Sequence, residues 1–402
     1  MTLPDLFQWL LGAAAIVLWL PVGTLALQVW LARRGETPIG PLATHPARPG
    51  MAVLVPAHNE QAVIDATLAN LLPQLQPTDR LLVVADNCTD DTAQLARRAG
   101  AEVVERFHEY ERGKGFALDF GVRHLASQPP EVLVIVDADC QVEHGSVQKL
   151  AQMAMTHQRP VQALYLMHAP AGATLKQRVA EWAWRVKNQV RPLGWHRMGW
   201  PCQLMGTGMA FPWPMAERMA LANGHLVEDM KLGADLALAG TPPLFCPHAC
   251  VTSEFPVAAA AQQSQRKRWE HGHLSMLLSL GPRVLWQGLK RRHLPTVAMA
   301  LDMLVPPVAL LGMLQAVLWL AALGLVLAAG SAYAAPWVAA TVLVGLFTVA
   351  LWRAWWGWGR DLVSAREWLQ VPFYLLAKVP LYVGFIFRRQ KAWVRTDRQS
   401  KP

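Results

Sequence analysis

EVLVIVDADC, residues 131–140, joins an unbroken apolar run to two acids. A short apolar run of this kind is typical of a strand buried on both faces of a sheet. Two carboxylates one residue apart at its end, Asp137 and Asp139, can hold a hard divalent cation, and the cation can bridge a diphosphate. Loops often carry solvated acids, so the pair alone is weak evidence for a metal site. Its position directly after a buried strand favours the metal interpretation.

The sequence before this stretch repeats the pattern of an apolar strand, a polar loop and a helix. MAVLVPAHNE (51–60) and RLLVVADNCTDD (80–91) have the strand pattern, and the residues after each have helical spacing. Strands alternating with helices predict a parallel, doubly wound α/β sheet. In such sheets ligands bind at the carboxyl ends of the strands. Those ends carry His58-Asn59-Glu60, Asp86-Asn87 and the acids Asp137 and Asp139.

The composition predicts a membrane protein. Hydrophobic residues make up 53% of the 402 residues and charged residues only 16%. The net charge of +9 suits contact with anionic membrane lipids and anionic substrates. We expect no nucleic-acid partner, because no basic stripe with interleaved aromatics dominates the polar region. The five cysteines show no framework spacing, which fits a reducing compartment, and Cys246 and Cys250 lack the spacing of common zinc knuckles.

Three apolar runs are long enough to cross a bilayer. Leu6–Leu31 is nearly uncharged, nothing basic precedes it, and Arg33-Arg34 follow it. That order of charges favours an uncleaved anchor that leaves the next domain in the cytoplasm. Leu304–Leu327 and Trp337–Trp352 are the two other predicted spans.

The apolar segment 371–387 is ambiguous, because Lys378 and Pro380 interrupt it. Two downstream spans return the chain to the side of the α/β domain, where the basic tail that follows belongs. A third full span would place that tail outside. We therefore interpret 371–387 as interfacial or re-entrant. Thr174–Val190 and Pro282–His293 are further amphipathic candidates for the interface.

The chain is accordingly divided at the changes in composition. The predicted parts are an N-terminal transmembrane anchor (1–34), a Pro/Gly linker (35–50), a cytoplasmic α/β domain with interfacial helices (51–273), an interfacial segment (274–303), a C-terminal membrane region (304–387) and a basic cytoplasmic tail (388–402). The predicted location is the inner (cytoplasmic) membrane, with several membrane passes.

Each remaining polar motif has a plain structural explanation beside a functional one. Asp86 can accept a hydrogen bond from a base edge, while Thr89 and Asp90 can form a turn and cap the next helix. Lys114 in RGKG can approach a phosphate closely, although a glycine-flanked lysine is also an ordinary loop. Glu228-Asp229 begin a predicted amphipathic helix, where they can cap it or supply a general base.

A basic stretch near the membrane, QRKRW (265–269), also allows two explanations. Gln265, Arg268 and Trp269 stand at positions i, i+3 and i+4, so they share one face of a helix. An arginine fork suits a diphosphate, and tryptophan supplies a stacking surface. Arg266 and Lys267 point elsewhere, where lipid headgroups or solvent explain them.

The order of these motifs is a stronger signal than any single one. VPAHNE, an Asp after the second strand, RGKG, the D-x-D pair, Glu-Asp and Q-x-x-R-W follow one another within roughly Met51–Trp269. This order resembles the processive branch of the family 2 glycosyltransferases, which includes the cellulose, hyaluronan and poly-N-acetylglucosamine synthases. The resemblance implies a GT-A nucleotide-sugar-binding domain inserted between transmembrane helices. It further implies a metal-dependent, inverting β-glycosyltransferase, here a hexosyltransferase.

The resemblance implies a donor site at the strand ends. Ala57 and Glu60 would contact the nucleoside, and Asp86 would read the uracil edge of a UDP-sugar. Lys114 would lie near the base or a phosphate. Asp137 and Asp139 would hold the nucleotide and Mg²⁺ or Mn²⁺.

The resemblance also implies an acceptor side. Asp229 would be the base, with Glu228 beside it. Gln265 and Arg268 would contact the diphosphate, and Trp269 would form the floor of the acceptor site. The tail motif Trp393, Thr396 and Arg398 is similar to the gating segment of hyaluronan synthases, with one inserted residue. Ala85-Asp86-Asn87 departs from the usual pair after the second strand, which loosens the choice of nucleotide.

The implied acceptor is a growing polysaccharide or a lipid-linked glycan at the cytoplasmic membrane face, with polysaccharide export or synthesis proteins as implied partners. A second hypothesis is transfer of a single sugar to a lipid, as in proteins that resemble ceramide glucosyltransferase. A transporter or membrane scaffold is a hypothesis from another class. It requires ionisable residues within paired spans and no ordered acidic motifs, so the polar domain disfavours it.

Overall fold

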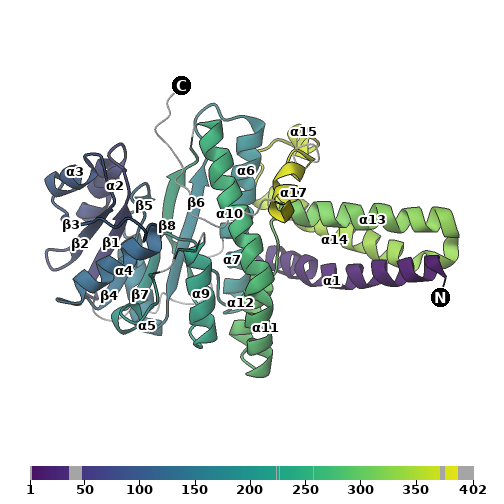
Figure 1. The fold of residues 1–402 in the computed structure, drawn as a ribbon, viewed down its shortest axis with the longest axis horizontal. Coiled ribbons are helices and arrows are strands. Elements are labelled where there is room, and N and C mark those ends of the chain that lie inside the picture. Colours follow the sequence, from purple (N-terminus) through teal and green to yellow (C-terminus); the bar gives the residue numbers. More distant parts are fainter. Residues whose placement is uncertain are drawn as a thin grey trace.

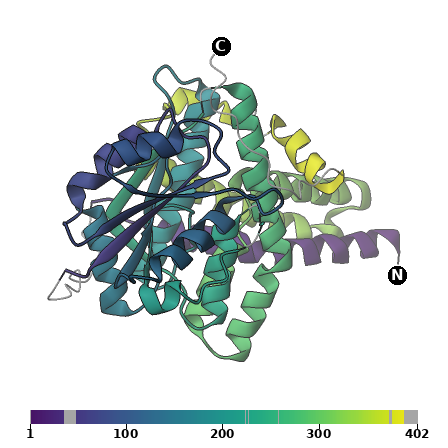
Figure 2. The ribbon, with the colours of Figure 1, turned by 60° about the vertical axis from the view of Figure 1, so that its left-hand side comes forward.

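The computed structural model describes residues 2–35, 48–222, 224–225, 227–256, 258–371 and 376–387. An α/β domain occupies one end of the molecule, and three long helices project from it side by side (Figure 1). A second view keeps the same separation between the sheet and the projecting helices (Figure 2). Helix α10 (Ala259–Ser279) runs along the junction of the two regions.

The α/β domain is built on one sheet of eight strands in the order β3-β2-β1-β4-β7-β6-β8-β5. The strands are β1 (Met51–Ala57), β2 (Arg80–Asp86), β3 (Glu102–Arg106), β4 (Val132–Ile135), β5 (Gln141–Val142), β6 (Val161–His168), β7 (Met209–Pro212) and β8 (Leu244–Glu254). Alternate residues of β1 enter the cores on opposite faces, Val53 and Val55 on one and Ala52 and Leu54 on the other. The unbroken apolar pattern of β1 follows from this two-sided burial.

The prediction of a parallel sheet is confirmed for one half of the sheet, whereas the other half is mixed, with β6 and β8 parallel to each other. Strands β1, β2, β3 and β4 pair in parallel. Strand β7 runs antiparallel to both β4 and β6, and β5 runs antiparallel to β8. Apolar periodicity reports burial but not strand direction, so the mixed half could not be recognised from it.

Helices cover both faces of the sheet. They are α2 (Ile64–Leu71), α3 (Thr92–Arg98), α4 (Lys114–Leu125), α5 (Ser146–His157), α6 (Leu175–Arg185), α7 (Arg191–Arg197), α8 (Trp213–Ala216) and α9 (Glu228–Leu238), with short turns η1 (Leu72–Gln74) and η2 (Val186–Val190). Residues of α2, α3 and α5 share one core, while α4 and α9 pack in the other. The turn η2 is a π-helical insertion between α6 and α7.

The projecting bundle consists of α1 (Leu3–Leu31), α13 (Val308–Ala329) and α14 (Ala335–Trp358). All three are long and apolar enough to cross a membrane. They overlap the three spans predicted from sequence: α1 begins slightly earlier than its span, α13 is shifted towards the C-terminus, and α14 extends its span at both ends. Their facing residues form a core of their own, which also contains Val179 and Trp182 of α6. The sheet domain therefore packs against the bundle through α6, η2 and α7.

Shorter helices connect the sheet domain to the bundle. They are α11 (Gly281–Lys290), α12 (Leu294–Met303), η3 (Ser331–Tyr333), α15 (Ala365–Trp368) and α17 (Val379–Phe387). Helix α17 lies in the segment predicted as interfacial or re-entrant, and it packs on α10. The rings of His271 and Phe385 lie 5.3 Å apart, and Lys378, just before α17, donates from Nζ to Glu270 Oε1 at 2.6 Å. The nine residues of α17 are about half of what a spanning helix needs.

Candidate active site

A cavity of about 830 Å³ opens at the carboxyl ends of β1, β2 and β4. Eleven of the residues proposed from sequence line it together: Ala57, Glu60, Asp86, Lys114, Asp137, Asp139, Glu228, Asp229, Gln265, Arg268 and Trp269. They come from segments spread over more than 200 residues of chain, so their convergence is a property of the fold. The three proposed gating residues, Trp393, Thr396 and Arg398, lie outside the described residues.

The loops after β1 and β2 are shaped by two asparagines in the left-handed region. Asn59 has φ of 55° and Asn87 has φ of 52°, which asparagine tolerates better than most residues. Asn59 Oδ1 accepts a hydrogen bond from the Thr89 backbone at 2.7 Å, which ties the two loops together. Thr89 therefore links loops, while Asp90 accepts from the Thr92 backbone at 3.1 Å at the start of α3.

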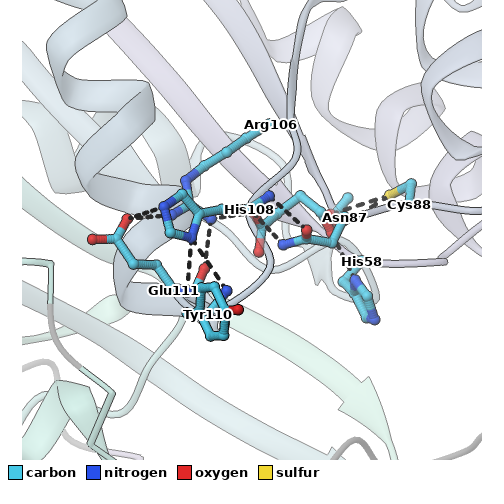
Figure 3. A network of polar contacts seen from close by, with 9 residues as sticks. His58, Asn87, Cys88, Arg106, His108, Tyr110 and Glu111 are labelled. Carbon is cyan, nitrogen blue, oxygen red and sulfur yellow. Dashed lines mark hydrogen bonds and ion pairs between the residues drawn. The ribbon is translucent and has the colours of Figure 1, made fainter.

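Asp86 is fixed by a buried ion pair that sequence reasoning missed. Its Oδ1 accepts from Arg106 Nη1 at 2.8 Å and from Asn87 Nδ2 at 3.1 Å, while Arg106 Nη2 reaches Glu111 Oε2 at 3.0 Å (Figure 3). Asp86 is 5% exposed and Arg106 8%. The arginine neutralises the buried carboxylate and holds it at the cavity wall. Arg106 stands at the end of β3, and no motif distinguishes it.

Lys114 joins the donor side of the cavity to its acceptor side. It begins α4 directly after Gly113, forms an ion pair with Asp137, and donates to the Gly206 carbonyl at 2.7 Å. Burial lowers the pKa of Lys114, but the carboxylates of Asp137, Glu228 and Asp229 outweigh burial and raise it above its usual value. The lysine therefore stays charged among these acids.

Glu228 and Asp229 begin α9, as predicted, and both face the cavity. Burial and the neighbouring Asp229 raise the pKa of Glu228 to about 7. Gly272 of α10 packs against Val227, the residue before this pair: a Cβ at Gly272 would lie 2.6 Å from Val227 Cγ1. The absence of a side chain at Gly272 therefore lets α10 approach the start of α9.

Helix α10 presents Gln265, Arg268 and Trp269 to the cavity, as their spacing predicts. The Trp269 ring lies 4.9 Å from the ring of Trp184, which in turn meets Tyr165 edge-on at 5.5 Å. Trp184 lies in Thr174–Val190, which the sequence predicts as an amphipathic interfacial segment, and its place in the site was not predicted. The interleaved aromatic residues were a usable signal, because stacked rings form platforms for sugars or bases.

The donor set suits a hard divalent cation. Asp137 and Asp139 line the cavity next to the charged ammonium of Lys114, so positive charge already lies against Asp137. Among the described residues there is no cluster of three or more His, Cys, Asp or Glu side chains that would hold a metal. A cation here would complete its shell with diphosphate oxygens and water, as Mg²⁺ commonly does.

Comparison with known proteins agrees with this geometry. Residues 49–272 match the family model described as glycosyltransferase like family 2. An uncharacterized glycosyltransferase of Mycobacterium tuberculosis is 31% identical over 198 residues, which cover 46% of this chain and 85% of the relative. A probable glucomannan 4-beta-mannosyltransferase of Arabidopsis thaliana is 27% identical over 274 residues, covering 60% of this chain and 46% of that protein.

A solved structure shares the overall arrangement. The mannosyltransferase PcManGT from Pyrobaculum calidifontis, in complex with GDP-Man and Mn²⁺, aligns with a TM-score of 0.57 at 19% identity. The alignment covers 94% of this chain and 100% of that one. The expected GT-A fold, flanked by apolar helices on both sides in sequence, is thereby confirmed.

Proposed function

This chain belongs to glycosyltransferase family 2, and from that premise we propose that it transfers a sugar from a nucleotide sugar, with inversion, to a glycan or lipid-linked acceptor at the cytoplasmic membrane face. The observation that carries the proposal is the convergence of eleven residues on one cavity at the strand ends. Acids for a metal, a candidate base and an arginine–tryptophan face all meet there. A purely structural role for these motifs would not require that they meet.

On the donor side, the loops after β1 and β2 receive the nucleoside. Ala57 and Glu60 line one wall, and Asp86 faces them with its Oδ1 engaged by Arg106. Asp86 Oδ2 makes no hydrogen bond within the described part of the chain, so it is the oxygen left to accept from a base. We infer a UDP-sugar donor. The comparison of UDP-sugars with GDP-sugars in a hydrolysis assay tests that choice.

Asp137 and Asp139 are the residues that would hold Mn²⁺ or Mg²⁺, and the cation would supply positive charge to the leaving diphosphate. Lys114, Gln265 and Arg268 add donors to the same side of the cavity. Arg268 and Gln265 are one helical turn apart, which suits two neighbouring phosphate oxygens. These residues bind and orient the donor before bond cleavage.

The acceptor hydroxyl is activated by Asp229. As the hydroxyl oxygen bonds to the anomeric carbon, the hydroxyl proton passes to the Asp229 carboxylate, and the bond from that carbon to the phosphate oxygen breaks. The electron pair of that bond leaves with the nucleoside diphosphate. Burial and the neighbouring Asp229 raise the pKa of Glu228 to about 7, so Glu228 can hold a proton near neutrality beside the proposed base. Attack opposite the leaving group inverts the anomeric centre.

Trp269 and Trp184 form the aromatic floor on the acceptor side, next to the helix bundle. A growing polysaccharide fits this floor, and so does a single sugar on a lipid. Product length distinguishes them: purified protein with a labelled nucleotide sugar yields a ladder or high polymer in the first case. One lipid-soluble product of fixed size would favour the second.

The decisive experiment replaces the proposed base. We expect Asp229→Asn to abolish transfer, with at least about a thousandfold loss, while nucleotide binding measured by calorimetry survives. Asp235→Asn is the matched control, because Asp235 lies on the same helix, pairs with Lys231 at 2.5 Å and does not line the cavity. Substantial turnover by Asp229→Asn would refute the assignment of the base.

A further inference from the structure

A second cavity, of about 180 Å³, adjoins the first on the side of the helix bundle. The two cavities share Trp184, Lys187, Gln265 and Trp269 as lining residues. Most residues that line the second cavity come from α6, α10, α13 and α14. Figure 1 shows these helices where the bundle leaves the sheet domain. A molecule in this second cavity would therefore be separated from the candidate active site only by the shared residues.

The bundle side of this cavity is apolar. Val308 and Ala309 come from α13, and Phe347 and Leu351 come from α14. These helices are among the three that are long and apolar enough to cross a membrane. A hydrocarbon chain is the ligand that such a wall accommodates, because sugar hydroxyls would lose their hydration there without replacement hydrogen bonds.

The side next to the active site carries positive charge. Lys187 and Arg266 both line the cavity, and neither has a carboxylate partner within the described part of the chain. The other cations are compensated: Arg191 pairs with Asp302 at 2.7 Å, and Lys378 pairs with Glu270 at 2.6 Å. An anion is therefore the group that the two remaining cations would stabilise.

Lys187 holds a special position among these residues. It stands in the π-helical turn η2, and its ammonium group lies 5.6 Å from the centre of the Trp184 ring. It lines both cavities, so an anion bound to it would lie at their boundary. Single π-helical turns often occur at functional sites, because the extra residue redirects side chains.

We propose that this second cavity binds the acceptor as a lipid-linked phosphate. The hydrocarbon next to the headgroup lies among the bundle residues, and the phosphate lies against Lys187 and Arg266. The hydroxyl-bearing group extends past Trp269 to Asp229. The cavity is smaller than typical ligand pockets of roughly 300–1,000 Å³, so it encloses only the part of the lipid nearest the phosphate. This inference rests on the proposed function, and it favours a lipid-linked acceptor over a neutral polymer.

The test measures binding, not transfer. Full-length protein in phosphatidylcholine nanodiscs is titrated with geranylgeranyl phosphate, with the matching alcohol geranylgeraniol, with inorganic phosphate and with phosphatidylglycerol. We expect the lipid phosphate to bind at least about tenfold more tightly than each of the other three, the contribution of about one charge-assisted hydrogen bond. Equal binding of the alcohol would overturn the role of the phosphate. Equal binding of phosphatidylglycerol would reduce the cavity to a general anionic-lipid site and overturn the proposal.

Variants locate the binding. Lys187→Met should weaken binding of the lipid phosphate about tenfold, and Ala180→Phe should do the same by filling the cavity, which Ala180 lines. Lys176→Met is the matched control, since Lys176 is an exposed lysine of α6 that does not line the cavity. Arg266→Met serves as an independent variant if Lys187→Met does not fold, as judged by thermal unfolding. The proposal would be overturned if binding is unchanged in Ala180→Phe and also in whichever of Lys187→Met and Arg266→Met is well folded.

The outcome is separable from that of the proposed function. Nucleotide binding and sugar transfer by the unmodified protein test the proposed function. Binding of the lipid phosphate tests the second cavity. If the protein binds the lipid phosphate through Lys187 but transfers no sugar, the proposed function alone is contradicted. If it transfers sugar but does not bind the lipid phosphate, this inference alone is contradicted.

Discussion

Two buried aspartate–arginine pairs lie in different regions of the molecule. Asp86 and Arg106 are 20 residues apart in the sheet domain, and their pair lies at the wall of the candidate active site. Arg191 and Asp302 are 111 residues apart, at the junction of the sheet domain and the bundle. The first pair holds one carboxylate oxygen and leaves the other for a ligand, whereas the second is enclosed by further protein partners.

The junction pair is the centre of a hydrogen-bonded network. Asp302 Oδ1 accepts from Gln28 Nε2 and its Oδ2 from Gln203 Nε2, each at 2.5 Å, while Arg191 Nε donates to Gln28 Oε1 at 3.0 Å. These residues belong to α1, α7, α12 and the segment before β7. A buried network of this kind, whose carboxylate oxygens both accept hydrogen bonds, fixes how elements pack, whereas the open pair at the cavity positions a ligand group.

The largest expected effect comes from breaking the junction pair. Asp302→Ala leaves the Arg191 guanidinium buried without its partner, so we expect a loss of about 3–5 kcal/mol in the free energy of unfolding. Thermal unfolding in detergent measures the loss. Asp361→Ala is the control, because Asp361 pairs with Arg185 but is 52% exposed, and exposed pairs contribute only about 0–1 kcal/mol.

A double variant sharpens the same result. Replacing both charged groups, as in Arg191→Met with Asp302→Leu, removes the unpaired charge and should recover most of the lost stability. If Asp302→Ala unfolds at the same temperature as Asp361→Ala, the junction network does not hold the bundle to the domain.

Breaking the cavity pair should lower the free energy of unfolding less than breaking the junction pair does, but it should lower nucleotide affinity. In Arg106→Met, the Asp86 carboxylate can turn towards water in the cavity, so we expect a loss of about 1–3 kcal/mol in the free energy of unfolding. Because Asp86 loses its fixed position, nucleotide affinity measured by calorimetry should fall about tenfold. Arg97→Met is the control, since Arg97 forms an exposed pair with Glu105. Unchanged nucleotide affinity would show that Arg106 only stabilises the fold.

The two regions are connected by the segment that leads into β7. Gln203 reaches the junction network, the Gly206 carbonyl accepts from Lys114, and Thr207 Oγ1 accepts from the Asp137 backbone at 3.0 Å. Gly206 has φ of +92°, and a Cβ there would lie 3.4 Å from Asp229 Oδ2. This glycine therefore allows the chain to pass close to the candidate base.

Gly206→Ala tests whether that segment matters for the reaction. A left-handed conformation costs an alanine about 1–2 kcal/mol, and relief of that strain would displace the segment that contacts Asp229 and Lys114, so kcat should fall about tenfold. Gly100→Ala is a close control, because Gly100 has φ of +95° with nothing within 4 Å of its Cβ position. Both variants should lose similar stability. Equal kcat in the two variants would show that the segment connects the two regions without affecting the reaction.

The difference between the cavity and the junction also explains which residues could be predicted from the sequence. Asp137, Asp139 and Asp86 follow apolar strands, so local pattern predicted them at one edge of the sheet, and helical spacing predicted one shared face for Gln265, Arg268 and Trp269. The order of the motifs and the family resemblance implied that the two groups meet, and all six line the cavity. Arg106, Arg191 and Trp184 were missed, because their partners lie on other elements and pairing across elements leaves no local spacing. The direction of β7 was missed for the same reason.

The smallest expected effect comes from the charge of Glu228 in the cavity. It has no equivalent in the junction network. Burial and Asp229 raise the pKa of Glu228 to about 7, above its usual value of 4.5. A raised carboxyl pKa contributes stability that is fully present below pH 4.5 and is lost as the pH rises through 7. We expect the unfolding temperature to fall over that window, and Glu228→Gln to flatten the fall. Glu217→Gln, at an exposed residue, should leave the profile unchanged. An identical pH profile in Glu228→Gln and the unmodified protein would mean that the fold does not raise the pKa of Glu228.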